Sequence, residues 1–405
     1  MNLYKKAQKF FWQSFFLPYK VYIAYKGHKI RKQEKIRVLF VVAELGPWKT
    51  EELFLRMREN LRFEPILGIT ESIEVEGAKE LLKRYIESKK YPYVDLDYSK
   101  YSINRIKPDL IFYYKPYDTS YRCEHIFKKH ISALPCVISY GFETLGTPIY
   151  LRHQIDKYAW YIFVENEIVR AKKKEMLGWR TNNLVATGIP MQDSLSMSKE
   201  KYNDPWKDNS GRKRIIYAPH HSIKGYNSNG IEYATFFEYC DFIFELAQKY
   251  SEKIVIAFKP HPRLYPNLVK IWGKEKTDMY YRKWKCLENG QLEMGEYTGL
   301  FMHSDAMIHD CGTFTVEYHF TKNPVLFLVG EGHNCDELND FGKKAFDMHY
   351  LGYTKDDVEK FINNVIDGID PRYEERNAFY EECLLPHNGK KACENIMNII
   401  LGKKE

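Results

Sequence analysis

Two adjacent histidines, His220 and His221, follow an apolar run in the second half of the 405-residue sequence, and Ser222 comes next. Imidazole side chains suit proton transfer near neutral pH. Because the run at 214–218 reads as a buried strand, these three residues are expected in a loop at its carboxyl end. We predict a catalytic role for His220 and His221; a polar loop exposed to solvent is the alternative.

A second cluster places Lys259, His261 and Arg263 directly after another apolar run, with prolines at 260 and 262. Proline restricts its own backbone and that of the residue before it, so the three side chains sit on a stiff turn. A fixed set of cationic and imidazole donors suits a phosphate or a diphosphate. We predict that Lys259 and Arg263 bind such a group and that His261 acts in catalysis; a rigid basic loop without a ligand is the alternative.

A third cluster lies where a short apolar run at 306–309 meets the start of a helix. It comprises His309, Asp310, Gly312, Thr313, Thr315 and Glu317. Hydroxyl and backbone N–H groups at a helix N-terminus bind anions, and Glu317 is placed to reach the ribose hydroxyls of a nucleotide. The alternative is an ordinary N-cap, with Thr313 or Thr315 capping and Glu317 completing a capping box. We expect the second and third clusters to meet at one edge of a sheet, since both follow predicted strands.

The elements that would position these clusters alternate between apolar, β-branched runs and helical stretches, which is typical of parallel α/β sheets. Strands are predicted at 36–43, 64–70, 109–114, 136–141, 161–165 and 184–188, then at 214–218, 253–258, 306–309 and 324–329, with helices between them such as 76–89 and 124–129. The fold class is therefore α/β, with two Rossmann-like parallel-sheet domains that face a central cleft. The predicted boundaries are a basic aromatic segment at 1–35, an N-terminal domain at 36–195, a linker at 196–212, a C-terminal domain at 213–380 and a closing helix at 381–405. The first strand–helix turn has no Gly-x-Gly-x-x-Gly pattern and no Walker A motif occurs, which excludes dehydrogenases and P-loop NTPases.

Charge is concentrated at the N-terminal end of the chain. The net charge is +7, but residues 1–37 hold ten Lys or Arg and one acid, so the remaining residues hold 51 bases and 53 acids and are close to neutral. This distribution excludes a globally basic nucleic-acid binder. The apolar stretch from Phe10 to Leu17 is too short to span a bilayer, and aromatic residues mixed with lysine suit docking on an anionic membrane surface. The alternative is a helix packed on the protein's own body.

Eight cysteines are scattered through the sequence without a CxxC pair or a regular spacing. In a chain of this length they indicate reduced thiols and a cytoplasmic location. No zinc pattern and no carboxylate cluster with metal-ligand spacing occurs, so neither a cofactor nor a metal ion is expected. With the basic end, these features predict a cytoplasmic protein that is peripheral on the inner face of the cell membrane.

Several short motifs share their order and spacing with a known family. They are Tyr-Ala-Pro at 217–219, Lys-Pro-His-Pro at 259–262, Asp310 with the hydroxyl residues after it, Lys-Asn-Pro-Val-Leu-Phe at 322–327 and the closing stretch at 387–396. Together they resemble the CDP-glycerol glycerophosphotransferases, which build teichoic acids and related capsular polymers, over roughly residues 105–400. The resemblance implies a GT-B fold whose second domain binds the donor. It also implies transfer of glycerol phosphate or ribitol phosphate from a CDP-activated donor to a hydroxyl of a membrane-linked saccharide or polymer, releasing CMP.

The resemblance also implies roles for individual residues. His261 matches a functional histidine of the family, and Asp310, Gly312, Thr313 and Glu317 match positions that hold the donor. The family usually has Trp-His-Gly-Thr-Pro in its first domain, with that histidine proposed as the base. Here Leu145 precedes the Gly-Thr-Pro, so the acceptor side is assigned to Tyr140, Gly141 and Thr147, and His220 or His221 is left to accept the proton.

Three other functions use the same two-domain plan. A GT-B glycosyltransferase would bind a nucleotide sugar in the same cleft, with Glu317 on its ribose. A non-hydrolysing sugar-nucleotide 2-epimerase would need acidic catalytic residues in the first half, and a membrane-docked scaffold would have lost catalysis. The expected partners are thus a CDP-activated small molecule, a lipid-linked saccharide acceptor and an anionic membrane surface, without nucleic acid.

Overall fold

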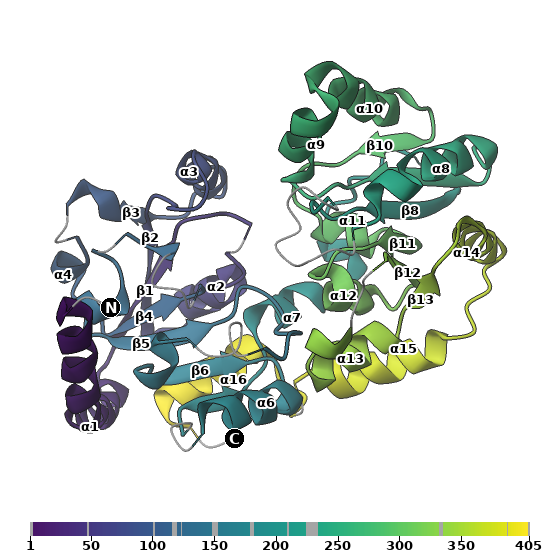
Figure 1. The fold of residues 1–405 in the computed structure, drawn as a ribbon. Helices are drawn as coiled ribbons and strands as arrows, with labels where there is room; N and C mark the ends of the chain where they lie inside the picture. The colour runs from purple at the N-terminus through teal and green to yellow at the C-terminus, as the bar shows by residue number, and fades with distance from the viewer. Residues whose placement is uncertain are drawn as a thin grey trace. The chain divides into compact units, whose positions relative to one another are not determined.

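The computed structural model of this chain describes all residues except 1–2, 47, 100–101, 116–119, 123, 148–152, 179–181, 209, 224–233, 332–334, 387 and 404–405, and it describes side chains from Phe16 onward. Pro148 and His387 of the sequence motifs therefore lie outside the described residues. The chain divides into two units. The first unit comprises Met1–Ser194 and Leu385–Glu405, and the second comprises Leu195–Leu384 (Figure 1).

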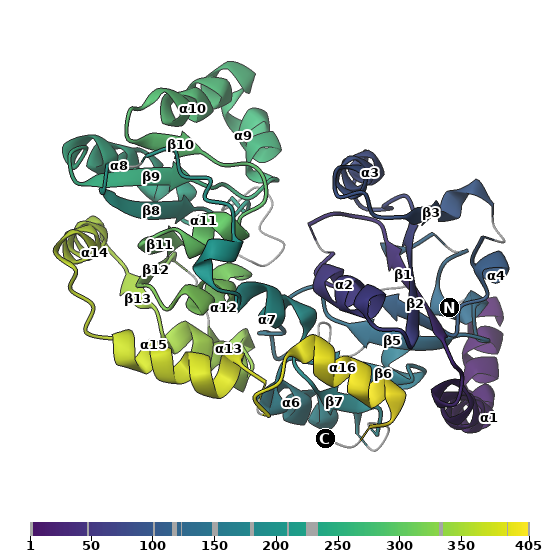
Figure 2. The same ribbon diagram turned by 180° about the vertical axis from the view of Figure 1, so that it is seen from behind.

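The first unit is built on a seven-stranded parallel sheet of order β3-β2-β1-β4-β5-β6-β7. Its strands are β1 Ile36–Val42, β2 Phe63–Ile69, β3 Tyr93–Asp95, β4 Leu110–Tyr113, β5 Leu134–Ile138, β6 Tyr161–Val164 and β7 Leu184–Ala186. Its helices are α1 Leu3–Arg31, α2 Glu51–Glu59, α3 Ala78–Ser88, α4 Ser102–Ile106, α6 Glu167–Leu177, α7 Pro190–Leu195 and α16 Ala392–Leu401. Helices α2 and α16 lie side by side on one face of this sheet (Figure 2).

The second unit is built on a six-stranded parallel sheet of order β10-β9-β8-β11-β12-β13. Its strands are β8 Lys213–Ala218, β9 Ile254–Phe258, β10 Gly290–Leu292, β11 Ala306–His309, β12 Val325–Leu328 and β13 Tyr350–Gly352. Its helices are α8 Phe236–Lys249, α9 Leu264–Trp272, α10 Lys274–Cys286, α11 Thr298–Met302, α12 Phe314–Glu317, α13 Asp340–Asp347, α14 Lys355–Asp367 and α15 Tyr373–Phe379. The prediction of an α/β protein with two parallel sheets is confirmed.

Burial on both faces explains why the strands of the second unit read as continuous apolar runs. Along β8, Ile215 and Tyr217 enter one buried cluster, and Ile216 and Ala218 enter another, as the two-residue period of a strand requires. The first cluster is centred on the ring of Trp284, which is fully buried. The sheet is therefore a rigid base for the residues that follow its strands.

Strand order reverses once in each sheet, between β1 and β4 in the first unit and between β8 and β11 in the second. In doubly wound sheets, ligands bind outside the carboxyl ends of the strands at such a reversal. Each unit thus has one edge of its sheet where a site is expected on topological grounds alone.

Helix α1 packs on the first unit along one face of its described half. Phe16, Tyr19, Ile23 and Ile30 are buried at helical spacing, while the opposite face carries exposed apolar side chains. These exposed side chains are Leu17, Val21 and Tyr25. The described half of the segment thus packs on the protein body, which was the alternative to docking. Within the described part of the chain, no helix is long and apolar enough to cross a membrane.

The polar stretch expected as a linker, 196–212, lies within the second unit. Trp206 is buried there, and its indole N–H donates to the carbonyl of Leu300 at 3.1 Å. In the closing segment, α16 belongs to the first unit, where Asp193 accepts the backbone N–H groups of Ala392 and Cys393 at 2.8 Å each. These bonds satisfy the open amide groups at the start of α16.

Candidate functional site

The three clusters singled out in the sequence meet at the carboxyl edge of the second sheet. Strands β9, β8 and β11 are neighbours, so the residues after Phe258, Ala218 and His309 emerge side by side. The loops are also bonded to one another. The backbone N–H of His261 donates to the carbonyl of Pro219 at 3.1 Å. Sequence clusters that lie 40 to 50 residues apart along the chain thus form one surface around the strand reversal.

Asp310 joins the loop after β8 to the start of α8. One carboxylate oxygen accepts the backbone N–H of His220 at 2.6 Å, and the other accepts the N–H of Thr235 at 2.7 Å and its hydroxyl at 3.0 Å. Burial raises the pKa of Asp310, and these hydrogen bonds act in the opposite direction. Asp310 therefore holds the histidine loop in place. Thr235, which the sequence did not single out, is its partner.

The rings of His220, His221 and His261 contact one another. Their centroids are 4.2 Å apart for His220 and His221, 4.4 Å for His221 and His261, and 5.5 Å for His220 and His261. Burial lowers the pKa of His220 to about 4. Burial also lowers the pKa of His221 to about 4, and the nearby His220 and Arg263 act in the same direction. Burial and the other two imidazoles lower the pKa of His261 to about 3. All three rings are therefore neutral at pH 7.

Lys259 links the second cluster to the third through Tyr297. The Lys259 ammonium lies 5.9 Å from the centre of the Tyr297 ring, and the Tyr297 hydroxyl donates to a carboxylate oxygen of Glu317. Lys259 and Glu317 are 5% and 1% exposed, so both charges are held inside the edge of the sheet. The two clusters therefore converge, and Tyr297, which sequence reasoning missed, is the group between them.

The remaining residues of the third cluster face in different directions. Gly312 and Thr313 are at the surface, and Thr313 makes no side-chain capping bond, so the capping-box alternative is not what the structure shows. The Thr315 side chain is buried, and its hydroxyl donates to the carbonyl of Cys311 at 3.5 Å. Arg263 is exposed at the start of α9, and its backbone N–H donates to Nδ1 of His261 at 3.1 Å.

His309, predicted to touch the donor, is fully buried. Its Nδ1 accepts the backbone N–H of Cys311 at 3.1 Å, and its Nε2 lies 3.1 Å from Nε2 of His349. The Nδ1 of His349 in turn bonds the carbonyl of Ala345 at 3.1 Å. This ring is directed into the core because side chains alternate along a strand, whereas the Asp310 carboxylate, which is also buried, turns to the backbone N–H groups of His220 and Thr235. The structure thus makes His309 a positioning residue for the Asp310–Thr313 loop.

The residues predicted for the acceptor side follow β5 in the first unit. Tyr140 is 39% exposed, and Gly141 and Thr147 are partly exposed. The loop between them is tied down at Glu143, whose backbone N–H donates to Glu165 at 2.6 Å and whose carboxylate pairs with Lys173 at 2.6 Å. Burial raises the pKa of Glu165 well above its usual range.

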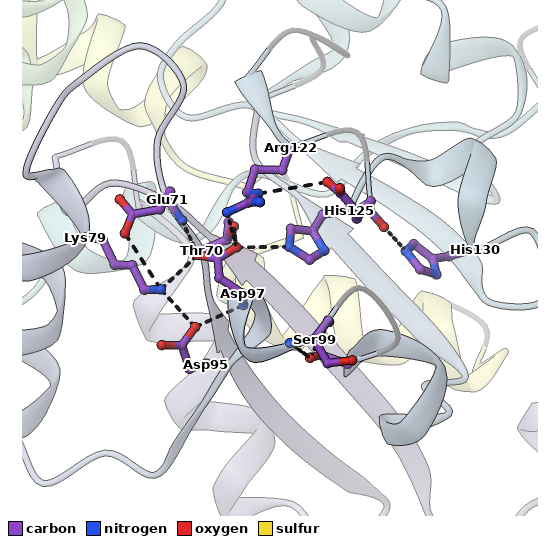
Figure 3. Close-up of polar contacts among 11 residues, drawn as sticks. Thr70, Glu71, Lys79, Asp95, Asp97, Ser99, Arg122, His125 and His130 are labelled. Carbon is purple, nitrogen blue, oxygen red and sulfur yellow. Dashed lines mark hydrogen bonds and ion pairs between the residues drawn. The ribbon is translucent and has the colours of Figure 1, made fainter.

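The carboxyl edge of the first sheet carries a different polar network, centred on Asp97 (Figure 3). Asp97 accepts the hydroxyl of Thr70, the ammonium of Lys79 and the N–H of Glu71, each at 2.8 Å, and Nε2 of His125 lies at 3.3 Å. Burial acts to raise the pKa of Asp97, but bonds from His125, Lys79 and Thr70 hold it well below its usual range. The sequence did not reveal this network because its members come from separate loops. Among the described residues, no group of three or more His, Cys, Asp or Glu is arranged to hold a metal ion.

The family model for CDP-Glycerol:Poly(glycerophosphate) glycerophosphotransferase matches residues 140–402, which is more than half of the chain. The chain belongs to this family. It is also similar to the teichoic acid poly(ribitol-phosphate) polymerase of Bacillus spizizenii, with 21% identity over 262 residues. That match covers 59% of this chain and 40% of the polymerase, so the chain spans less than half the length of this relative.

Solved structures with the same two-domain architecture show the fold. A structure of the wall teichoic acid polymerase TagF soaked with CDPG has a TM-score of 0.62 at 14% identity and covers 91% of this chain and 89% of that one. The S. aureus MnaA–UDP structure has a TM-score of 0.59 at 16% identity and covers 91% and 96%. The expected GT-B-like fold and the family resemblance are both confirmed.

Proposed function

We propose that this protein transfers glycerol phosphate or ribitol phosphate from a CDP-activated donor to a hydroxyl of a membrane-linked saccharide or polymer, releasing CMP, in teichoic-acid or capsule synthesis. The observation that carries the proposal is the edge around β8 and β11, where three imidazoles, Lys259 and Arg263 converge in a member of the glycerophosphotransferase family. The polymerase relative and the TagF structure soaked with CDPG support the donor class.

The geometry suits phosphoryl transfer without a covalent intermediate. The acceptor oxygen attacks the β-phosphorus, the bond from that phosphorus to the bridging oxygen breaks, and CMP leaves. Such reactions depend mainly on positioning and on stabilising negative charge. Lys259 and Arg263 supply the positive charge, His261 donates to the departing CMP, and His220 or His221 takes the proton of the acceptor.

The nucleoside would lie toward Glu317. A buried carboxylate bonded to the Tyr297 hydroxyl is suited to ribose hydroxyls, since charged acceptors make the stronger hydrogen bonds. The Asp310–Thr313 loop and Thr315 complete the donor side, with His309 supporting them from the core. The acceptor would bind on the side of Tyr140, Gly141 and Thr147.

Membrane association forms part of the proposal. The outward face of α1 presents Leu17, Val21 and Tyr25, and the helix is rich in lysine. An apolar stripe flanked by basic residues favours an anionic lipid surface. This would place the protein at the inner face of the membrane, close to a lipid-linked acceptor.

A donor screen tests the proposal. The full chain is incubated with CDP-glycerol, CDP-ribitol and a panel of UDP- and GDP-sugars, together with a lipid-linked saccharide. Release of CMP and a product whose mass rises by one polyol phosphate is the expected result. Turnover of a nucleotide sugar alone would replace the proposal with a GT-B glycosyltransferase. Absence of turnover with every donor would support the scaffold reading.

A further inference from the structure

We propose that His221 is the ring of the three-imidazole cluster that takes the proton of the acceptor hydroxyl, while His220 and His261 act as N–H donors to the diphosphate. The inference rests on the proposed function and resolves the choice that the sequence leaves between His220 and His221. It is carried by the hydrogen bonds that each ring makes in the structure.

Two of the rings have one nitrogen committed as an acceptor. Nδ1 of His220 accepts the backbone N–H of Ser222 at 3.2 Å, and Nδ1 of His261 accepts the backbone N–H of Arg263 at 3.1 Å. A neutral imidazole carries its single proton on one nitrogen, so in both rings that proton is on Nε2. Neither ring can therefore accept a proton at Nε2 while neutral, and Nδ1 is already occupied. Both are set up as hydrogen-bond donors.

The His221 ring is free of this constraint. Its Nδ1 is buried and accepts no hydrogen bond from another described residue, and the residue's own backbone favours the protonated ring, so Nδ1 can carry the ring proton. The backbone is nevertheless fixed, because the side-chain amide of Asn267 donates to the His221 carbonyl at 2.9 Å. The ring is partly exposed and contacts both other rings. With its proton on the buried Nδ1, His221 can present an unprotonated Nε2 to a substrate from a stable position.

The groups around His221 make its pKa depend on whether the CDP-activated donor is bound. His220 and His261 face it from the β8 and β9 loops, and Arg263 faces it from the start of α9; Lys259 acts on the same cluster through His261. The Asp310 carboxylate is turned to backbone N–H groups. The low pKa of about 4 makes free His221 a weak base. A bound diphosphate brings negative charge beside these groups and raises that pKa toward neutrality, where a general base works best.

The step balances with the groups named. The acceptor O–H proton passes to a nitrogen of His221, the acceptor oxygen forms the new bond to the β-phosphorus, and the bond to the CMP oxygen breaks. His221 then returns the proton to solvent after CMP leaves. Proton removal becomes effective only with donor bound, which would protect the free enzyme from unproductive chemistry.

Steady-state kinetics of single variants distinguish the roles of the three imidazole rings. His221→Ala is expected to lower kcat by about 10²- to 10⁴-fold with the KM for CDP-glycerol changed less than about threefold, and added imidazole should restore part of the rate. His220→Asn and His261→Asn should raise that KM and should not respond to imidazole. Lys285→Ala, on the exposed surface of α10, is the control. Thermal unfolding checks that each variant is folded.

The pH profiles and histidine NMR give readouts that a structural role would not move. The acid limb of kcat should lie at higher pH than the acid limb of kcat/KM, because the first reports the donor-bound enzyme and the second the free enzyme. In ¹⁵N-histidine spectra, His220 and His261 should be Nε2–H tautomers, and CDP-glycerol should raise the pKa of His221. CDP-glycerol suits this titration because its diphosphate diester has no group that titrates near neutral pH.

The results that would overturn the His221 assignment differ from the results that would overturn the proposed function. Wild-type kcat in a folded His221→Ala variant, coincident acid limbs, or a protonated Nδ1 on His220 would each overturn the assignment while leaving CMP release intact. If the wild-type chain releases no CMP from any CDP-polyol, the proposed function fails first. Imidazole rescue confined to His221→Ala would establish the assignment.

Discussion

The two sheets reverse their strand order in the same way, yet the residues at the two reversals have opposite electrostatic character. At the first, Lys115 after β4 pairs with Glu44 after β1 at 2.7 Å and with Glu74 at 3.0 Å, so cation and carboxylates neutralise one another. At the second, three neutral imidazoles contact one another, and the Asp310 carboxylate is bonded to backbone N–H and hydroxyl groups and, among the described residues, not to a cation.

This difference teaches that one sheet topology can carry two edges of different chemistry. The edge of the second sheet offers donors and positive charge to an anion, which a nucleoside diphosphate supplies. The edge of the first sheet has satisfied its own charges, since Lys115, Glu44 and Glu74 bond one another. Topology places both edges, and the side chains after the strands decide their chemistry.

The largest effect is expected from the donor edge. His261→Ala removes an N–H donor from the diphosphate site, and we expect CMP release from CDP-glycerol to fall at least about 100-fold. Steady-state assays of CMP measure this change. Thr147→Ala, on the acceptor side, should leave the KM for the donor unchanged. A rate equal to wild type for His261→Ala would remove this residue from the mechanism.

A pair of lysine variants compares the two edges directly. Lys115→Met removes the cation that Glu44 and Glu74 share and should lower the free energy of unfolding by about 2 kcal/mol, without altering donor affinity. Lys259→Met should weaken CDP-glycerol binding about tenfold and change the free energy of unfolding by less than about 1 kcal/mol. Urea unfolding and calorimetric titration measure the two quantities. The reverse pattern would contradict the contrast between the edges.

The carboxylates at the two edges should give opposite pH dependences. The lowered pKa of Asp97 stabilises the fold above its unfolded value near ~4, and this contribution is lost as the pH falls. Asp97→Asn should therefore cost about 1 kcal/mol at neutral pH and less in acid. The raised pKa of Asp310 acts in the opposite direction, because its contribution to the free energy of unfolding falls as the pH rises above ~4. Asp310→Asn should therefore reduce this fall. Unfolding curves across pH would show whether the signs differ.

The smallest effect on stability is expected at the exposed face of α1. Replacing Leu17, Val21 and Tyr25 with serine should reduce binding to anionic vesicles about tenfold, because apolar area at the lipid surface is lost. The free energy of unfolding should change by less than about 1 kcal/mol. Met279→Ser on α10 of the second unit, an exposed apolar residue, is the control. Vesicle sedimentation with anionic and zwitterionic lipid measures the binding; no loss for the triple variant would remove this face from the docking surface.

The sequence by itself determined the parallel sheets and most of the donor edge. Long apolar runs are read directly as strands buried on both faces, and residues after such strands are expected at one edge. The clusters at 220–222, 259–263 and 310–317 were found in this way, and the family motifs lie in the same positions.

Only the tertiary structure decided the three-residue strands and the contacts between residues far apart in the chain. Strands β3, β10 and β13 have three residues each, too few to show a period, and exist because a neighbouring strand offers hydrogen bonds. The helix predicted at 124–129 is wrong, since only a 3₁₀ turn at Phe127–Lys129 forms there. Thr235 bonds Asp310, Tyr297 bonds Glu317, and the His309 ring turns into the core, because strand order and side-chain alternation are set by contacts between residues far apart in the chain.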